Sequence, residues 1–194
     1  MGSLVALDQA ALIAAEGNEE HQFLTFRLGE ESFAIRILNV REIIEYTAPT
    51  VVPLMPPFLR GVINLRGKVV PVIDLAQRFD REATALGRRT CIIIVEVQGE
   101  DGHQDLGVIV DAVSQVVEIP PADIEPAPSF GTRLRAEFIA GIGKVEGQFV
   151  IVLDIERALS VTEISALATA GASAGTGGGV GAALAPPANT GAPS

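Results

Sequence analysis

Apolar and polar residues alternate, or valine and isoleucine gather in short runs, along most of the chain between residues 22 and 160. Residues 23–28 form one such segment, a Gly-Glu-Glu turn follows, and residues 32–36 complete a predicted hairpin. Further strands are predicted at 61–65, 68–73, 91–97, 106–110, 114–119 and 148–153, and short helical pieces at 37–42, 75–79 and 155–159. Many short strands separated by glycine and proline predict an all-β sandwich or barrel.

The sequence repeats itself at an offset of 80 residues. Residues 58–75 align without a gap over residues 138–155, and the two segments share Phe, Gly, Gly, Val, Val and Asp at equivalent places. A second alignment between the two copies places residues 34–40 over residues 107–113, at an offset of 73. The repeat predicts two copies of one module, at about 23–79 and 90–159, joined by a charged stretch at 80–89.

Each module carries roughly five strands, and so small a sheet removes its unpaired edges by closing into a barrel. Gly67 and Gly147 are predicted at hairpin turns that need a left-handed residue. Asp74 and Asp154 each end a strand before a helical piece, which is the usual N-cap position. The expected architecture is therefore two duplicated five-stranded β-barrels with short helices.

The two ends of the chain differ in composition from this middle part. Residues 1–21 lack the basic region of a signal peptide and are expected to be a flexible leader. Residues 161–194 form a low-complexity tail rich in Ala, Gly and Pro, and the last charged residue is Glu163. A tail with so little to bury is expected to be disordered, and truncation after Thr162 is expected to leave the thermal midpoint unchanged.

Charge and cysteine content limit the function classes. The net charge of −10 and the pI near 4.6 argue against nucleic acid or an anionic membrane as partner. The single cysteine, Cys91, stands in an apolar strand segment and cannot form a disulfide within the chain. We therefore expect a cytoplasmic protein with no direct membrane insertion.

Catalytic and metal-binding patterns are weak. Asp101, His103 and Asp105 are expected in a solvated hairpin loop, where a cation site is disfavoured. Gly141-Ile-Gly143 resembles a phosphate loop only faintly, because no helix follows it. We expect no catalytic residues, no metal and no cofactor. A small hydrolase that uses the carboxylates of Asp74 and Asp154 remains an alternative.

Positions at which the two copies differ are the candidates for function. Arg66 in the first copy aligns with Glu146 in the second, and Asn64 aligns with Lys144, so the first tip is basic where the second is acidic. Drift on a solvated turn and a division of tasks both explain this difference. Ile37, Val40 and Ile44 would share one helical face. Phe130 lies in a proline-rich loop, either as a plug of the barrel or as a partner anchor.

Several of these segments together resemble the CheW family of bacterial chemotaxis coupling proteins. The matching strings are Phe-Ala-Ile-Arg-Ile-Leu-Asn-Val-Arg-Glu-Ile at 33–43, Gly-Val-Ile-Asn-Leu-Arg-Gly at 61–67 and Val-Pro-Val-Ile-Asp-Leu at 70–75. Leu-Gly-Val-Ile-Val-Asp-Ala-Val at 106–113 and Glu-Pro-Ala-Pro at 125–128, followed by Phe130, match as well. The resemblance covers residues 22–160, which would form a single CheW-like domain.

The resemblance implies two SH3-like barrels and a non-enzymatic adaptor that couples methyl-accepting chemoreceptors to the histidine kinase CheA at membrane receptor arrays. It also implies contact with the regulatory domain of the kinase, in alternating rings of kinase and adaptor. Service in a non-flagellar pathway, for pili or gliding, remains an alternative. The implied receptor-binding residues are Ile37, Val40, Glu42, Gly61, Asn64 and Arg66, and the implied kinase-binding residues are Phe130 and Gly141.

Overall fold

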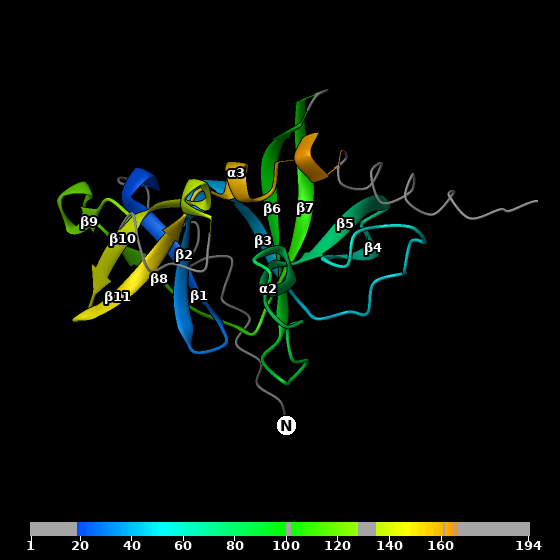
Figure 1. The fold of residues 1–194 in the computed structure, drawn as a ribbon, viewed down its shortest axis with the longest axis horizontal. Helices are drawn as coiled ribbons and strands as arrows, with labels where there is room; N and C mark the ends of the chain where they lie inside the picture. Colours follow the sequence, from blue (N-terminus) through cyan, green and yellow to red (C-terminus); the bar gives the residue numbers. More distant parts are fainter. Residues whose placement is uncertain (1–18, 100–101, 128–134, 161, 165, 167–194) are drawn as a thin grey trace, which may run out of the picture.

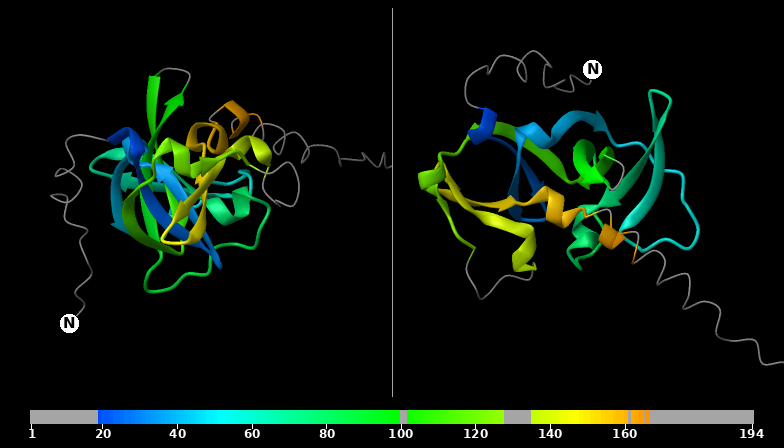
Figure 2. Two further views of the ribbon diagram at one scale, coloured as in Figure 1. Left: turned by 90° about the vertical axis from the view of Figure 1, so that its left-hand side faces the viewer. Right: turned by 90° about the horizontal axis from the view of Figure 1, so that it is seen from above.

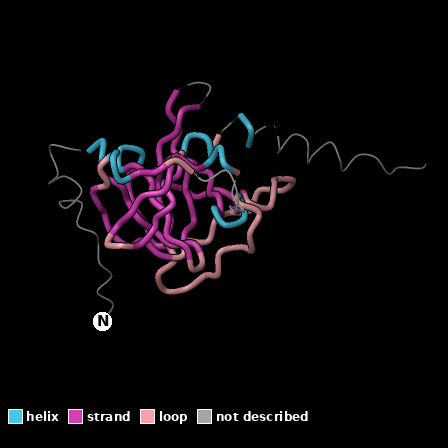
Figure 3. Tube along the Cα trace, turned by 60° about the vertical axis from the view of Figure 1, so that its left-hand side comes forward, coloured by secondary structure: helices cyan, strands magenta, loops and turns pink. Residues whose placement is uncertain are grey.

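The computed structural model describes residues 19–99, 102–127, 135–160, 162–164 and 166. Strands dominate these residues, and the helices are single short turns (Figure 3). Two curved sheets lie side by side, one around β1, β2 and β8 to β11 and the other around β3 to β7 (Figure 1). This arrangement confirms the predicted all-β class with two barrel-like sheets.

The strands and helices follow one another with short connections, apart from residues 46–58, 79–90 and 126–135. In chain order the elements are η1 (Glu19–His21), β1 (Gln22–Leu28), β2 (Glu31–Arg36), η2 (Ile37–Asn39), β3 (Val40–Glu45), β4 (Leu59–Leu65), β5 (Lys68–Asp74), α2 (Leu75–Arg78), β6 (Cys91–Gly99), β7 (Gly102–Val110), β8 (Ala112–Glu118), η3 (Pro121–Asp123), β9 (Ile124–Glu125), η4 (Ala136–Phe138), β10 (Ile139–Val145), β11 (Gln148–Leu153) and α3 (Ile155–Ala158).

Each sheet takes strands from both copies of the repeat. The strand order is β8-β1-β2-β11-β10-β9 in the six-stranded sheet and β3-β6-β7-β5-β4 in the five-stranded sheet. The first copy therefore contributes its first hairpin, β1–β2, to one sheet and β3 to β5 to the other. The second copy contributes its first hairpin, β6–β7, to the five-stranded sheet and β8 to β11 to the six-stranded sheet. The boundary between the sheets thus differs from the boundary between the two modules predicted at 23–79 and 90–159.

Strand register confirms both offsets of the repeat. The parallel pair β5–β7 places Val72 opposite Gly107, and the parallel pair β11–β2 places Val152 opposite Ala34. Val152 is 80 residues after Val72, and Gly107 is 73 residues after Ala34. The two copies have therefore kept the same pairing although they exchange their first hairpins. Figure 2 shows the result of the exchange, with the blue hairpin of the first copy beside the yellow strands of the second.

Three apolar clusters fill the fold. The cluster within the five-stranded sheet includes Ile63, Val72 and Ile92. The cluster within the six-stranded sheet includes Phe23 and Val152. The largest cluster joins the two sheets and draws from β1, β2 and β5 to β7 as well as from both helices α2 and α3. Because this shared core is the largest, the two sheets are expected to unfold together.

Two predicted elements are wrong. The helix expected at 37–42 ends at Asn39, and Val40 begins strand β3, because Val40, Ile43 and Ile44 pair with the apolar strand β6. The solvated loop expected around His103 is a strand, since β7 begins at Gly102 and His103 pairs with Gln98. The sequence predictions also lacked β3, the two-residue β9 and β10 as strands.

The expected tail begins too early. Residues 162–164 are helical, Ile164 packs against the shared core, and Glu163 bonds to Arg78. The reason is that Arg78 is buried and needs a carboxylate, which the end of the domain supplies. Residues 1–18 and 167–194, for which a flexible leader and a disordered tail were predicted, lie outside the described residues.

Candidate functional site

The β4–β5 hairpin tip is formed by Arg66 and Gly67, which both have left-handed backbone conformations, at φ +52° and +85°. A tight two-residue turn between twisted antiparallel strands requires two left-handed residues in succession. The side-chain oxygen of Asn64 accepts a hydrogen bond from the Gly67 N–H at 2.8 Å, which stabilises the turn. Asn64, expected to face a receptor, therefore has a structural role in positioning Arg66.

Arg66 bonds to Glu42 across the end of this sheet. Its Nη2 lies 2.9 Å from Oε2 of Glu42, and the two side chains are 74% and 17% exposed. Glu42 follows a bulge between Val40 and Glu42 in the pairing of β3 with β6. It lies on the same face of β3 as Ile44, which packs inside this sheet. The half-buried carboxylate thus holds an exposed guanidinium in one orientation.

Ile37 and Val40 lie next to this ion pair along the chain but do not share a helical face. Ile37 is in η2 and Val40 is the first residue of β3. Both are partly buried and pack against the core between the sheets. Only part of each side chain is therefore available to a partner, and substitution of either residue should affect stability as well as binding.

Gly61 and Gly141 occupy equivalent places in the two sheets, each beside a bulge. A Cβ on Gly61 would overlap the carbonyl oxygen of Thr50, and the residue has φ +136°. A Cβ on Gly141 would lie 2.5 Å from Cγ2 of Ile124 and 2.7 Å from the carbonyl oxygen of Glu125. Close approach of a neighbouring backbone explains both glycines, which leaves their predicted roles toward receptor and kinase as proposals.

Phe130, predicted to bind the kinase, lies outside the described residues. Arg41, which the sequence did not single out, forms an ion pair with Glu96, beside the Glu42 bulge. The sequence also gave no reason to select Arg78, a buried arginine between Phe58 and Phe138. Its position after a helical cap residue was visible in the sequence, but its burial depends on residues far along the chain.

Asp74 and Asp154, the carboxylates considered for hydrolysis, and also Asp111 accept hydrogen bonds within the fold. Asp74 caps α2 and also accepts hydrogen bonds from the backbone N–H and the hydroxyl of Thr84, both at 2.9 Å. Asp154 caps α3. Asp111 accepts a hydrogen bond from the Gly29 N–H at 2.5 Å. These contacts explain all three residues as parts of the fold.

The remaining candidate groups of the described residues are the Cys91 thiol and the metal-ligating side chains. Burial raises the pKa of the Cys91 thiol, so this half-buried group is protonated at neutral pH. Within the described ranges, no three His, Cys, Asp or Glu side chains lie close enough together to hold a metal ion. The described helices include none with the length and apolar character needed to cross a membrane.

Comparison with known proteins places this arrangement in a family. A CheW-like domain model matches residues 22–163. The chemotaxis protein CheW of Klebsiella aerogenes is 37% identical over 144 residues, which cover 74% of this chain and 84% of that protein. Protein FrzA of Myxococcus xanthus is 30% identical and covers 80% of this chain and 96% of its own length. The crystal structure of the scaffolding protein TtCheW from Thermoanaerobacter tengcongensis superimposes with a TM-score of 0.66, at 36% identity, and covers 73% of this chain and 88% of that one. The chain belongs to the CheW family of chemotaxis scaffold proteins.

Proposed function

We propose that this protein is a non-enzymatic adaptor that couples methyl-accepting chemoreceptors to the histidine kinase CheA. The observation that carries the proposal is the Arg66–Glu42 pair. It lies at the tip of one copy of a duplicated fold, while the equivalent tip of the other copy carries Glu146 in place of Arg66. The fold does not require the arginine, so selection for binding is the better explanation of its placement.

The receptor would contact the surface around this pair. Val40 and Ile37 supply partly exposed apolar area beside it, and the hairpin tip supplies the guanidinium. A receptor segment with an apolar face and a hydrogen-bond acceptor would complement such a surface. Gly61 and Asn64 would contribute by holding the backbone of the hairpin rather than by direct contact.

The kinase would bind through the other sheet. Gly141 belongs to β10, and Figure 1 shows β8 to β11 on the left of the molecule and the β4–β5 hairpin on the right. Phe130 is proposed as an anchor of the same contact. With the receptor on one sheet and the kinase on the other, neither partner would block the site of the other. Both could therefore bind at once, as a coupling protein requires. We further propose that the adaptor is cytoplasmic, is recruited to membrane receptor arrays and forms rings with the kinase.

A reconstitution with purified components tests the coupling. The full chain is mixed with receptor signalling fragments and kinase from the same cell, and co-sedimentation and kinase phosphorylation are measured. We expect the chain to bring kinase into the receptor pellet and to raise phosphorylation in a receptor-dependent manner. Failure of both effects with every receptor and kinase of the cell would overturn the proposal.

The receptors and the kinase that this adaptor binds determine which signalling pathway it serves. FrzA, a relative with a different name, is similar over most of its length, so similarity alone does not select flagellar chemotaxis over a pathway for pili or gliding. Gene deletion followed by separate assays of swimming and of surface motility distinguishes the two. A defect in surface motility alone would assign the adaptor to the second pathway.

A further inference from the structure

Arg78 is a buried cation at the junction of the two copies. It is the last residue of α2, and its side chain is 3% exposed. Its guanidinium lies over the rings of Phe58 and Phe138, the equivalent phenylalanines of the two copies, at 5.3 and 4.8 Å from the centroids. Its Nε donates a hydrogen bond to the carbonyl oxygen of Ala158 at 2.9 Å. A charge buried this deeply needs an anion beside it.

Glu163 supplies this anion. One carboxylate oxygen lies 2.9 Å from Nη2 of Arg78 and the other lies 2.9 Å from Nη1 of Arg135. The segment that carries Glu163 is short, and the Glu163 side chain is 33% exposed. Besides the two ion pairs of Glu163, three contacts hold the described part of this segment. Ile164 packs on the core and donates its N–H to the carbonyl oxygen of Ser160, and the Glu163 N–H donates to the Ser160 hydroxyl oxygen at 3.4 Å. A segment held so lightly can leave while both sheets stay folded.

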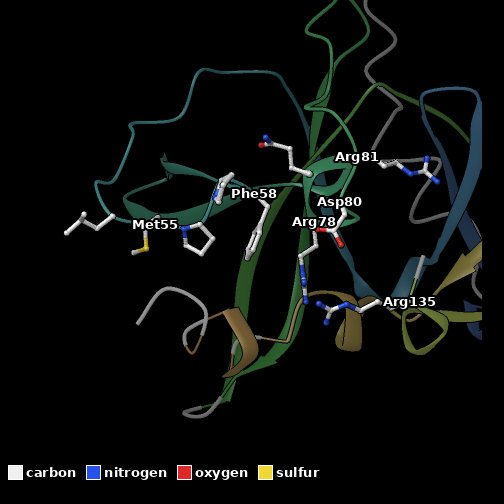
Figure 4. A pocket seen from close by; sticks show the side chains of 10 residues that line it. Met55, Phe58, Arg78, Asp80, Arg81 and Arg135 are labelled. Carbon is white, nitrogen blue, oxygen red and sulfur yellow. The ribbon is translucent and has the colours of Figure 1, made fainter. Parts of the chain in front are cut away.

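An open pocket of about 740 Å³ adjoins Arg78 and Arg135, whose guanidinium ends lie close together in Figure 4. Its lining residues are Leu54, Met55, Pro56, Pro57, Phe58, Gln77, Arg78, Asp80, Arg81 and Arg135. One side is thus apolar, and the other carries the three arginines together with one carboxylate, that of Asp80. Leu54 is 77% exposed and has φ +63°, a conformation that costs a non-glycine residue free energy. The chain therefore keeps an apolar side chain in solvent on a strained turn.

The opposite wall offers an unused polar group as well. The side-chain oxygen of Gln77 is buried and has no hydrogen-bond partner among the described residues. Gln77 lines the pocket, so its lining includes a buried acceptor without a partner among the described residues. An apolar wall, paired arginines and a spare acceptor together match a peptide, which carries apolar side chains, carboxylates and backbone N–H groups.

We propose that this pocket binds an acidic peptide segment whose glutamate takes the place of Glu163 between Arg78 and Arg135. The chain's own Glu163-Ile164 shows the chemistry of the occupant, which is a carboxylate followed by an aliphatic side chain. Phosphate alone would leave the apolar wall uncovered. The pocket shares no residue with the predicted receptor-binding and kinase-binding positions, so it adds a docking surface to the adaptor and stands independently of the receptor assignment.

A labelled peptide tests this site in the full chain. The probe is an amidated peptide with the sequence of residues 159–166, and its control carries glutamine in place of the glutamate. Fluorescence anisotropy measures binding to the wild-type chain and to Glu163→Gln, which removes the competing charge. We expect the glutamate peptide to bind Glu163→Gln about tenfold more tightly than the wild type, because the internal competitor acts at a high effective concentration. The glutamine peptide should bind at least about tenfold more weakly than the glutamate peptide.

Matched variants locate the contact. In the Glu163→Gln chain, Arg135→Gln and Leu54→Ser should each weaken binding severalfold. Arg157→Gln should not, because that exposed arginine pairs with Asp154 on α3, outside the pocket lining. If Glu163→Gln does not fold at the assay temperature, Leu54→Ser is compared with the wild type at higher peptide concentration. Absence of binding, equal binding of the two peptides, or no effect of Leu54→Ser overturns the proposal.

Discussion

The hairpin tips of the two copies have the same backbone and different side chains. Arg66 and Glu146 have φ values of +52° and +50°, and the glycines that follow them have +85° and +80°. In the first copy Arg66 bonds to Glu42 of β3. In the second copy Gln115 stands at the place equivalent to Glu42, at the offset of 73, and no ion pair of Glu146 occurs among the described residues.

This comparison separates what the fold requires from what it permits. The turn requires a left-handed residue followed by glycine, and the strand after it requires a capping aspartate before the helix. Neither copy requires a particular charge at the tip. The Arg66–Glu42 pair is therefore a difference between the copies that folding does not require, and partner binding is the reason that we propose for it. The experiments below test this separation, from the largest expected effect to the smallest.

The largest effect is expected at the glycines that both copies keep. Gly61→Ala should destabilise the fold by roughly 4 kcal/mol, because the new Cβ overlaps the carbonyl oxygen of Thr50 and φ is positive. Gly141→Ala should cost less, about 2 kcal/mol, since part of its overlap is with the movable side chain of Ile124. Urea unfolding measures both. A Gly61→Ala chain with normal stability and lost receptor binding would instead make Gly61 an interface residue.

The second largest effect on stability is expected at the capping aspartates, and it should differ between Asp74 and Asp154. Asp74→Ala should cost about 3 kcal/mol, because Asp74 is buried and its loss leaves the backbone N–H and hydroxyl of Thr84 without their acceptor. Asp154→Ala should cost about 1 kcal/mol, the usual value for a partly exposed N-cap. Thermal unfolding of the two variants gives the difference. Equal losses of stability in the two variants would mean that the hydrogen bonds from Thr84 to Asp74 do not stabilise the fold.

Truncation after Thr162 should lower stability by about 2 kcal/mol. It removes Ile164 from the core and leaves Arg78 buried without its carboxylate, although solvent partly compensates because Glu163 is one third exposed. The control is truncation after Ala166, which keeps every contact of the described residues and should leave the thermal midpoint unchanged. Identical midpoints of the two truncated chains would restore the original expectation that the fold ends at residue 160.

The repeat made much of this fold predictable. The offset of 80 placed the turn glycines and the capping aspartates, because the same local chemistry occurs twice. The structure adds that the two offsets also relate the two parallel strand pairs. The exchange of the first hairpins between sheets was not predictable, since either arrangement would satisfy the same strand patterns. Val40 was misassigned because its apolar spacing suits both a helix and a strand, and only pairing with β6 decides between them.

The candidate site was predictable in part. Arg66 is selected by its mismatch with Glu146, and the family resemblance names Glu42 among the receptor-binding residues; the structure adds the ion pair between them. Arg78 and Glu163 were not found, because they are 85 residues apart and their contact depends on how the end of the second copy folds back on the first. Burial of a charge is a property of tertiary packing, and no local pattern in either segment indicates it.

The smallest effect on stability and the most direct test of the account both concern Arg66. Arg66→Ala and its matched variant Glu146→Ala should each change the free energy of unfolding by no more than about 1 kcal/mol, because both side chains are exposed. In the reconstituted mixture of receptor fragments, kinase and adaptor, Arg66→Ala should reduce receptor-dependent kinase phosphorylation at least about tenfold, whereas Glu146→Ala should reduce it far less. Equal phosphorylation with Arg66→Ala and the wild type would contradict the claim that the difference between the two copies serves partner binding.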